Sequence, residues 1–463
     1  MRQTKRTFVM FSFYDRTGIR EYLERQAAQG WMLEKTSALG WVFRRIEPQR
    51  VHFAVTYFPQ ASVFDPEPSE EQQLFRDFCA HTGWRLVAAN AQMQIFCNEG
   101  ADPVPIETDA VLEVETIHKA MKKFFLPNYL LMLLTDMLVL ALWVWRLGQD
   151  PIGVLSNQAE LFTGLFWGMG MLLMLLDVGG YMGWYRRARA AAELDGSFVP
   201  TRAYRGFKLA WLVFLLVAFI CMLVSVGWQM AWIVPLTIAV ILAITGIVVG
   251  ISELLKRCKV RANVNRGVTI VLTAVLSFGV AGIALIMIVS GIHSGWSTKD
   301  AAGTYEVAGH TFHIYADELP LTVENLLPVE YDGYSYELRS YESLLLGRHN
   351  ACQRGRLDGP DMPRLDYTVV EVKLPSLYAL CREEMLNDIV ANYGLAEGDD
   401  LWQSYNEVDA VPWGAAAAYQ VSMGTGELEQ YLLCYERCIV EIRFDWQVTE
   451  EQKAVVGEKF GSK

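Results

Sequence analysis

Five long runs of apolar residues place the strongest constraint on how this chain folds. Each run is long enough to cross the roughly 30 Å hydrocarbon core of a bilayer, which takes about 20 helical residues. The runs cover residues 124–145, 161–184, 209–227, 231–251 and 268–291. The third and fourth are separated only by a short loop at Trp228 and Gln229, but together they are too long for one crossing. The sequence therefore predicts an integral membrane protein with a five-helix α-helical bundle.

Basic residues in the loops predict the orientation of this bundle. They precede the first run, follow the second and follow the fourth: Lys122, Lys123, Arg186, Arg187, Arg189, Arg202, Arg205, Lys208, Lys256, Arg257, Lys259, Arg261 and Arg266. The loop between the first two runs carries only Arg146 beside Asp150 and Glu160. Because loops rich in Lys and Arg stay in the cytoplasm, we expect a multi-pass protein of the plasma membrane. Its N-terminus is expected inside and its C-terminal residues outside.

The charge is unevenly distributed along the chain. The net charge is −12 overall, yet residues 299–463 hold 13 basic and 29 acidic residues. Such a surface would repel phosphate, so we expect no direct binding of nucleic acid. Strand and helix patterns alternate here, with strands predicted at 306–315, 419–423 and 430–444 and a helix at 374–393. The sequence predicts an acidic extracytoplasmic α+β domain at 292–463.

The first 105 residues contain an internal repeat. A strand at 7–13, a helix at 15–29 and a strand pair at 31–36 and 40–46 are followed by a strand at 50–58, a helix at 69–82 and a second strand pair at 84–89 and 92–97. An offset of 53 residues aligns Gly30 with Gly83 and Trp31 with Trp84. We therefore predict a cytoplasmic α+β domain of two βαββ repeats. The glycines are expected to end the helices, and the tryptophans to form structural core, with a ligand platform as the alternative.

Several short motifs in this region resemble those of a known family. They are Phe13-Tyr14-Asp15, the stretch from Ala27 to Leu33 with its Gly-Trp pair, Gly40-Trp-Val-Phe43 and Gly83-Trp84. Followed by membrane helices with basic rims, they are similar to domain-of-unknown-function family 2812, membrane proteins of mostly Gram-positive bacteria. The resemblance implies a cytoplasmic domain on a membrane anchor and no known activity. Genes of this family often lie beside those of PadR-like transcriptional repressors, which makes such a regulator a candidate cytoplasmic partner.

Residues 106–123 are predicted to form an amphipathic helix that connects the N-terminal domain to the first membrane run. Val111, Val114, Ile117 and Met121 recur near helical spacing. His118 borders this stripe and is expected to be a packed or interfacial side chain rather than a pH switch. A helix that continues into the membrane would connect the two compartments mechanically, although a rigid spacer has the same sequence pattern.

Two carboxylic acids lie inside the apolar runs, at Asp136 and Asp177. A carboxylate is costly in the bilayer and is often functional there. The two could share a proton, or each could bond a neighbouring hydroxyl. They motivate an alternative hypothesis, in which the chain is a small transporter or a transporter accessory subunit.

Cys434 and Cys438 flank a predicted hairpin turn in the C-terminal domain. A three-residue turn would place the two cysteines opposite each other, at a spacing that a disulfide tolerates. With a two-residue turn, Tyr435 would face Cys438 and Cys434 would point to the other side of the sheet. The alternative to a disulfide is that both are small buried hydrophobic residues.

The sequence shows no nucleophile–base pair, no set of metal ligands and no phosphate-binding loop. We therefore predict that the chain is not an enzyme and holds no cofactor or metal. The favoured hypothesis is a membrane sensor or regulator. Its outer domain would bind a ligand or envelope component, and its inner domain would bind a cytoplasmic protein partner.

Overall fold

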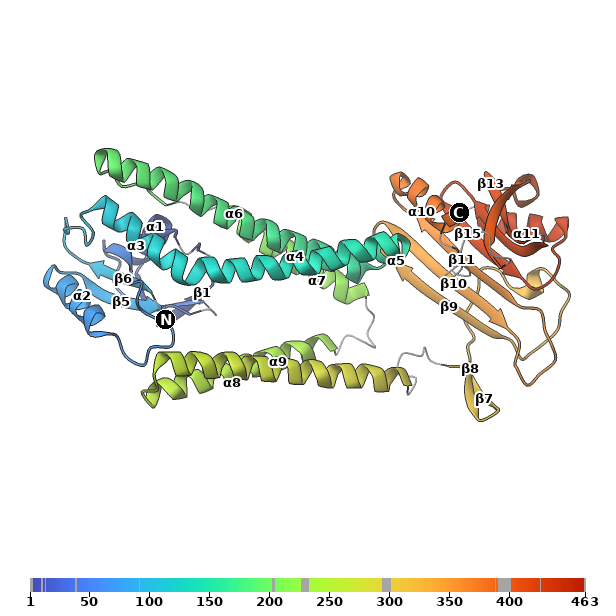
Figure 1. The fold of residues 1–463 in the computed structure, drawn as a ribbon, viewed down its shortest axis with the longest axis horizontal. Coiled ribbons are helices and arrows are strands. Elements are labelled where there is room, and N and C mark those ends of the chain that lie inside the picture. The colour runs from blue at the N-terminus through green and yellow to red at the C-terminus, as the bar shows by residue number, and fades with distance from the viewer. Residues whose placement is uncertain are drawn as a thin grey trace. The chain divides into compact units, whose positions relative to one another are not determined.

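The computed structural model describes residues 3–9, 11–12, 14–37, 40–90, 92–201, 205–225, 233–293, 301–387, 389, 401–424 and 426–461 (Figure 1). The chain forms two compact units. The first comprises Met1–Leu140 and Phe166–Met287, and the second comprises Ala141–Leu165 and Ile288–Lys463.

The N-terminal part of the first unit consists of two βαββ units in succession. The first contains β1 (Thr4–Thr7), α1 (Arg16–Ala28), β2 (Trp31–Lys35) and β3 (Trp41–Arg45). The second contains β4 (His52–Tyr57), α2 (Glu70–His81), β5 (Arg85–Asn90) and β6 (Met93–Asn98). The antiparallel sheets have equivalent strand orders, β1-β3-β2 and β4-β6-β5. The first strand lies earlier than the predicted 7–13, because residues 8, 9, 11 and 12 are outside the sheet; residues 10 and 13 are not among the described residues.

Local details of the two halves also repeat at the 53-residue offset. Gly30 and Gly83 follow the two helices with φ angles of +82° and +85°, in the left-handed region where a side chain would be strained. A β-bulge interrupts the pairing between Leu33 and Lys35, and another interrupts it between Leu86 and Ala88. Each bulge adds twist at the same place in its sheet. The predicted role of the glycines as helix ends therefore agrees with the backbone geometry.

The two equivalent tryptophans have different surroundings. Trp84 is 4% exposed, packs with Cys79 and Phe96, and donates from Nε1 to the carbonyl of Val104 at 2.8 Å. Trp31 is only half-buried on β2. Its ring lies 4.5 Å from the Lys5 ammonium, an arrangement that keeps one face near water. Trp84 is therefore fully buried core, whereas Trp31 is partly buried and packs against the edge of the main core.

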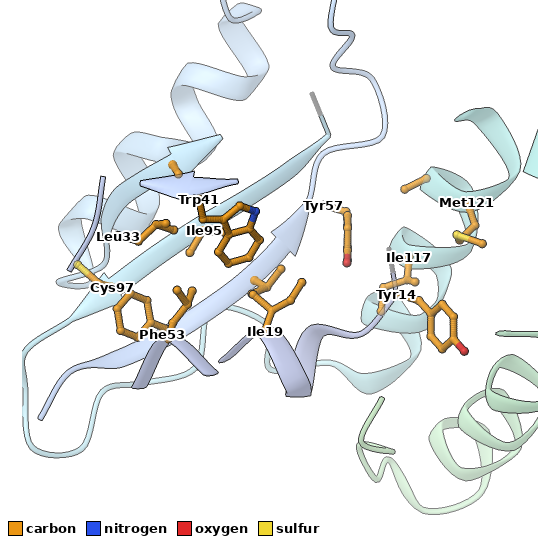
Figure 2. Packing of buried hydrophobic residues seen from close by; sticks show 14 of the residues in the cluster. Tyr14, Ile19, Leu33, Trp41, Phe53, Tyr57, Ile95, Cys97, Ile117 and Met121 are labelled. Atoms are coloured by element: carbon orange, nitrogen blue, oxygen red, sulfur yellow. The ribbon is translucent and has the colours of Figure 1, made fainter. Parts of the chain in front are cut away.

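The main core of this region extends beyond the expected boundary at residue 105. Figure 2 shows Ile19 of α1, Phe53 of β4 and Ile95 of β6 close together, with Ile117 and Met121 at one side. Side chains from near the end of a membrane helix complete the cluster: Tyr181, Trp184, Ala188 and Ala192. The N-terminal domain is therefore built partly from segments that follow it in the sequence.

A series of helices occupies the middle of the chain. They are α3 (Ala110–Ala120), the π-helix η1 (Met121–Phe125), α4 (Leu126–Gln149), α5 (Pro151–Ser156), α6 (Gln158–Asp195), α7 (Arg205–Ser225), α8 (Ile233–Arg257) and α9 (Ala262–His293). In the described part of the chain, four segments are long and apolar enough to cross a membrane: Leu126–Gln149, Gln158–Asp195, Ile238–Arg257 and Ala262–Val280. This indicates a membrane protein. The third predicted run, 209–227, overlaps α7, which is not among the four segments, and its last two residues lie outside the described part, so the fifth crossing remains a prediction.

The C-terminal domain is a mixed α+β domain around one large antiparallel sheet. The strands are β7 (Gly303–Val307), β8 (His310–Ile314), β9 (Ser335–Glu342), β10 (Leu346–Arg354), β11 (Leu365–Val372), β12 (Gln403–Val408), β13 (Ala417–Met423), β14 (Gly426–Cys434) and β15 (Cys438–Phe444). Seven form a sheet in the order β12-β13-β14-β15-β11-β10-β9, and β7 and β8 form a separate hairpin. The helical segments among the described residues of this domain are η2 (Val323–Asn325), η3 (Pro375–Leu377), α10 (Tyr378–Asn387), η5 (Val411–Trp413) and α11 (Glu450–Gly461).

Two expectations for this domain are refined. The strand predicted at 306–315 is a hairpin, because Ala308 and Gly309 both take positive φ angles and reverse the chain. The helix predicted at 374–393 begins as the 3₁₀ turn η3, and α10 ends at Asn387; of the remaining residues only 389 is described.

The proposed disulfide between Cys434 and Cys438 does not form in the structure, where both side chains are buried. The hairpin has the two-residue turn, because the amide of Tyr435 donates to the carbonyl of Cys438 at 2.8 Å. Cys434 therefore pairs with Ile439 and joins the core on one face of the sheet, whereas Cys438 joins the core on the other. The register separates the two sulfur atoms.

Candidate functional site

The connection between the N-terminal domain and the first membrane helix is continuous helix. Asp109 caps α3 by accepting from the amide of Val111 at 2.8 Å, so the helix begins later than the predicted residue 106. Val114 and Ile117 enter the core as predicted, but Val111 is exposed and Ala110 occupies the buried position instead. The helix continues through the π-helix η1 into α4 (Figure 1). π-Helical turns are rare in proteins, and those that occur are often found at functional sites.

The end of α6 forms the second connection. Tyr181 and Trp184 are almost fully buried, and the Trp184 indole donates to the carbonyl of Val199 at 3.3 Å. Tyr14 packs against both rings, with ring centroids 5.6 Å from Tyr181 and 6.1 Å from Trp184. Its hydroxyl lies 2.7 Å from the position of a Cβ at Gly180, so only glycine fits there without a shift. Tyr14 of the Phe-Tyr-Asp motif therefore packs the N-terminal domain against α6.

Polar contacts reinforce this junction, which we define by Ser12, Tyr14, His118, Asp177 and Tyr181. Ser12 Oγ donates to Asp177 Oδ1 at 2.9 Å. His118 Nδ1 lies 2.7 Å from the Tyr181 hydroxyl in a hydrogen bond. Burial lowers the pKa of His118, and the nearby charges of Lys122 and Arg189 lower it further. His118 is therefore a packed, neutral side chain at neutral pH, in line with the expectation for it.

The two acids predicted inside the apolar runs occupy different environments. Asp177 belongs to the junction and also accepts from the Tyr129 hydroxyl at 3.4 Å. Asp136 of α4 is 4% exposed and lies beside Gly170 of α6, and its Oδ2 has no hydrogen-bond partner within the described ranges. Gly170 is seven residues, about two helical turns, from Asp177. The structure therefore supports the bonding of Asp177 to neighbouring hydroxyls and does not bring the acids together to share a proton.

Helices α4 and α6 form a helical hairpin whose connection is the short helix α5. This helix is anchored in the second unit. Asp150 caps α5 by accepting from the amide of Gly153 at 2.7 Å, and Pro151 occupies the first helical position. Ile152 is buried in the cluster that also contains Leu346 of β10. Ser343 Oγ donates to the carbonyl of Leu155 at 2.5 Å. The loop between α4 and α6 is therefore an integral part of the C-terminal domain core.

Sequence reasoning missed this anchoring of α5 and an ion-pair group around Arg16. The Asp-Pro pair at 150–151 is a helix-start signal that could have identified α5. Arg16 binds the carboxylates of Glu107 and Glu113 at 2.8 and 2.9 Å. These residues are far apart in the sequence, and no spacing rule connects them.

Within the described ranges, no group of three His, Cys, Asp or Glu residues is arranged to hold a metal ion. The geometry of the junction is one of packing and hydrogen bonding between the N-terminal domain, α3 and the long apolar helix α6.

Comparison with known proteins identifies one relationship. A family model described as "Protein of unknown function (DUF2812)" matches residues 16–128, which confirms the resemblance inferred from the motifs. The matched region covers α1 to the first residues of α4 and therefore includes the continuous helix of the junction. No curated protein and no solved structure matches the chain.

Proposed function

We propose that this protein, which carries a DUF2812 domain at residues 16–128, is a non-enzymatic membrane regulator that couples its C-terminal domain to its N-terminal domain. In this proposal the N-terminal domain lies in the cytoplasm and the C-terminal domain lies outside the plasma membrane, as the basic loops predict. The C-terminal domain binds an external ligand or envelope component. The N-terminal domain binds a cytoplasmic protein, for which a PadR-like regulator is a candidate.

The observation that carries the proposal is the anchoring of one helical hairpin in both units. Helices α4 and α6 each have residues in both compact units. Their connecting helix α5 is buried in the C-terminal core. At the other end, α4 continues through η1 into α3, whose Ile117 is buried in the N-terminal core, and α6 reaches the same core through Trp184. A helix transmits a displacement along its axis, because its backbone hydrogen bonds resist stretching. A change at α5 therefore has a covalent, helical route to the N-terminal domain.

The π-helix η1 supplies an element that could have two arrangements. Coupling between distant sites requires such an element, since a ligand acts by shifting an equilibrium between states. A π-helical turn has i→i+5 hydrogen bonds, and converting it to α-helix changes the rotation of the segments on its two sides. At η1 this conversion would turn α4 relative to α3, whose Val114 and Ile117 lie in the N-terminal core.

Releasing α5 from the C-terminal core tests the coupling. In the full chain, reconstituted in lipid nanodiscs, Ile152→Asp should place an unpaired charge in the apolar cluster around Leu346 and detach α5. We expect amide hydrogen exchange to change by at least threefold in α3 and at the end of α6. Leu344→Ser is the matched control, because Leu344 lies next to Ser343 but is 84% exposed. Altered exchange confined to the C-terminal domain would contradict the proposed coupling.

An exposed apolar pair on α2 supports binding of a protein partner. Leu74 and Phe78 lie one helical turn apart and are 72% and 59% exposed. Exposed apolar side chains that lie together often mark interaction sites. Leu74→Ser with Phe78→Ser should reduce recovery of a PadR-like regulator with the full-length protein at least tenfold, as measured by quantitative co-purification. Glu70→Gln with Asp77→Asn, on the same helix, is the control; equal recovery with both double variants would place the partner site elsewhere.

Asp136 favours a second candidate function, in which the chain is a small transporter or transporter accessory subunit using Asp136 and Asp177. A buried carboxylate oxygen without a partner in the described part of the chain is unusual within an apolar helix. Asp177, however, is bonded to Ser12 of the N-terminal domain. We prefer the regulatory function because this second acid has a structural role at the junction.

A further inference from the structure

A cavity of about 800 Å³, large enough for a small organic molecule, lies in the N-terminal part of the first unit. Its walls come from the beginning of α1, strand β4, the segment before α3 and residues 198–201 after α6. We call it the N-terminal cavity. The junction residues defined above do not line it, so it is a separate feature of the domain.

The polar part of the cavity is the ion-pair group around Arg16. Arg16 Nη2 lies 2.8 Å from Glu107 Oε2, and Nη1 lies 2.9 Å from Glu113 Oε1. The three side chains are 14–18% exposed, so water screens them weakly. One guanidinium therefore faces two carboxylates, and the group keeps a net negative charge when all three residues are ionised.

A buried hydroxyl on the cavity wall lacks a partner. Thr56 of β4 is 1% exposed, and its Oγ1 makes no hydrogen bond within the described ranges. An unsatisfied buried hydroxyl is costly. It marks a position where a polar atom of a bound molecule or of water would be stabilised.

The remaining lining defines the chemistry of the ligand. The charged side chains are two arginines and four carboxylates, because Arg20, Glu24 and Asp102 join the group around Arg16, which gives a formal charge of −2. The other walls are largely apolar, with Phe53, Val55, Trp84, Ile106, Phe198 and Val199 among them. We propose that the N-terminal cavity binds a small organic cation, with an amine or amidine group against Glu107 and Glu113 and an apolar body against the aromatic walls.

Binding at this position would act on the connecting helix. Glu113 lies in the first turn of α3, which continues through η1 into α4. A cation that draws Glu113 away from Arg16 changes the contact between α1 and α3. This ligand site does not depend on the proposed coupling to the C-terminal domain, because it uses residues of the N-terminal region alone.

The protonation of Glu113 provides an independent readout. Burial raises the pKa of Glu113 to about 7, and the carboxylate of Glu107 adds to the rise while Arg16 opposes it. Tyr57 of β4 also faces this group. A proton and a ligand cation compete for the carboxylate, so affinity should weaken about tenfold from pH 8 to pH 6. His52 lines the same cavity, so the measurement is repeated in the His52→Gln variant, in which the pH dependence should persist.

Benzamidine is the probe for the experiment, with benzoate and benzyl alcohol as anionic and neutral analogues of similar shape. Binding to the full-length protein in detergent micelles is measured by ligand-observed NMR against empty micelles. We expect benzamidine to bind at least tenfold more tightly than either analogue. Glu113→Gln should weaken its binding at least tenfold and remove most of the pH dependence.

Two further variants keep the result interpretable. Glu115→Gln is the matched control, because Glu115 lies on the same helix but is exposed and outside the cavity; it should bind benzamidine like the unaltered protein. If Glu113→Gln fails to fold, Glu24→Gln at the same cavity should still weaken binding severalfold. Benzoate binding as tightly as benzamidine, or benzamidine affinity unchanged by every cavity variant, would overturn the proposal.

Discussion

Replacing Trp84 with alanine is expected to lower the free energy of unfolding of the N-terminal domain by about 3–5 kcal/mol, as for large aromatic truncations in other cores. The indole is almost completely buried against Cys79 and Phe96, both of which are fully buried. The substitution leaves a cavity between α2 and β6 and also removes the hydrogen bond from Nε1 to Val104. Hydrogen exchange of the β5 and β6 amides in the full chain measures the change.

Trp31→Ala is the matched comparison, because Trp31 is the equivalent residue in the first repeat. We expect a loss of only about 1–2 kcal/mol. The half-buried ring contributes partial burial and contacts with the Lys5 ammonium at 4.5 Å and the Arg45 guanidinium at 5.0 Å. Such contacts contribute about 0.5–1 kcal/mol each at exposed sites. Equal losses for the two variants would show that the surroundings of the tryptophans do not differ as described.

Trp84→Phe separates packing from hydrogen bonding. Phenylalanine keeps most of the apolar volume but cannot donate to Val104. Val104 is exposed, so we expect water to replace the indole as the donor to its carbonyl, and the loss should be about 1–2 kcal/mol. A loss as large as that of Trp84→Ala would mean that the hydrogen bond, rather than the ring volume, holds the segment after β6 in place.

The internal repeat explains why much of the N-terminal fold could be predicted. A glycine followed by a tryptophan after each helical pattern indicates a helix end followed by a strand, and both are local signals. Local signals cannot distinguish Trp31 from Trp84, however. The difference arises because Lys5 and Arg45 lie beside Trp31, whereas α2 covers Trp84. These contacts depend on tertiary packing, which the repeat does not specify.

The candidate site was predictable only in part, for the same reason. The apolar runs and Asp177 are visible in the sequence, but one hydrogen-bond partner of Asp177, Ser12, is 165 residues away. The group of Arg16, Glu107 and Glu113 likewise joins α1 to the segment before α3 and to α3 itself.

The turn at Glu436 and Arg437 shows a further limit of prediction from sequence. A change of one residue in turn length moves Cys434 to the other face of the sheet.

Replacing Gly457 with alanine is expected to destabilise the C-terminal domain by about 3 kcal/mol. Gly457 lies inside α11, where alanine would ordinarily be favoured by about 1 kcal/mol. Here a Cβ atom would come within 2.2 Å of the carbonyl oxygen of Trp413 and 2.7 Å of its carbonyl carbon. Both atoms belong to the backbone, so the clash cannot be relieved by a side-chain rotation.

The neighbouring contacts make a compensating movement costly. The Trp413 carbonyl accepts from the Tyr435 hydroxyl at 3.2 Å, and the Trp413 ring is 1% exposed. Val456 and Phe460, on the same helix, are fully buried in the core below the sheet. Moving α11 outward to accommodate a methyl group would reduce all of these contacts. The close approach of α11 to η5 therefore requires glycine at 457.

Gly461→Ala provides the matched control on the same helix. A Cβ at Gly461 would meet Tyr435 ring carbons at 3.5 and 3.6 Å, which is ordinary van der Waals contact. We expect a change within about 0.5 kcal/mol, as for most substitutions that meet no clash. Pulse proteolysis of the full-length protein in urea, with cleavage followed in the C-terminal domain, compares the two variants. Similar stability of Gly457→Ala and Gly461→Ala would show that α11 does not pack against the Trp413 backbone as closely as the structure indicates.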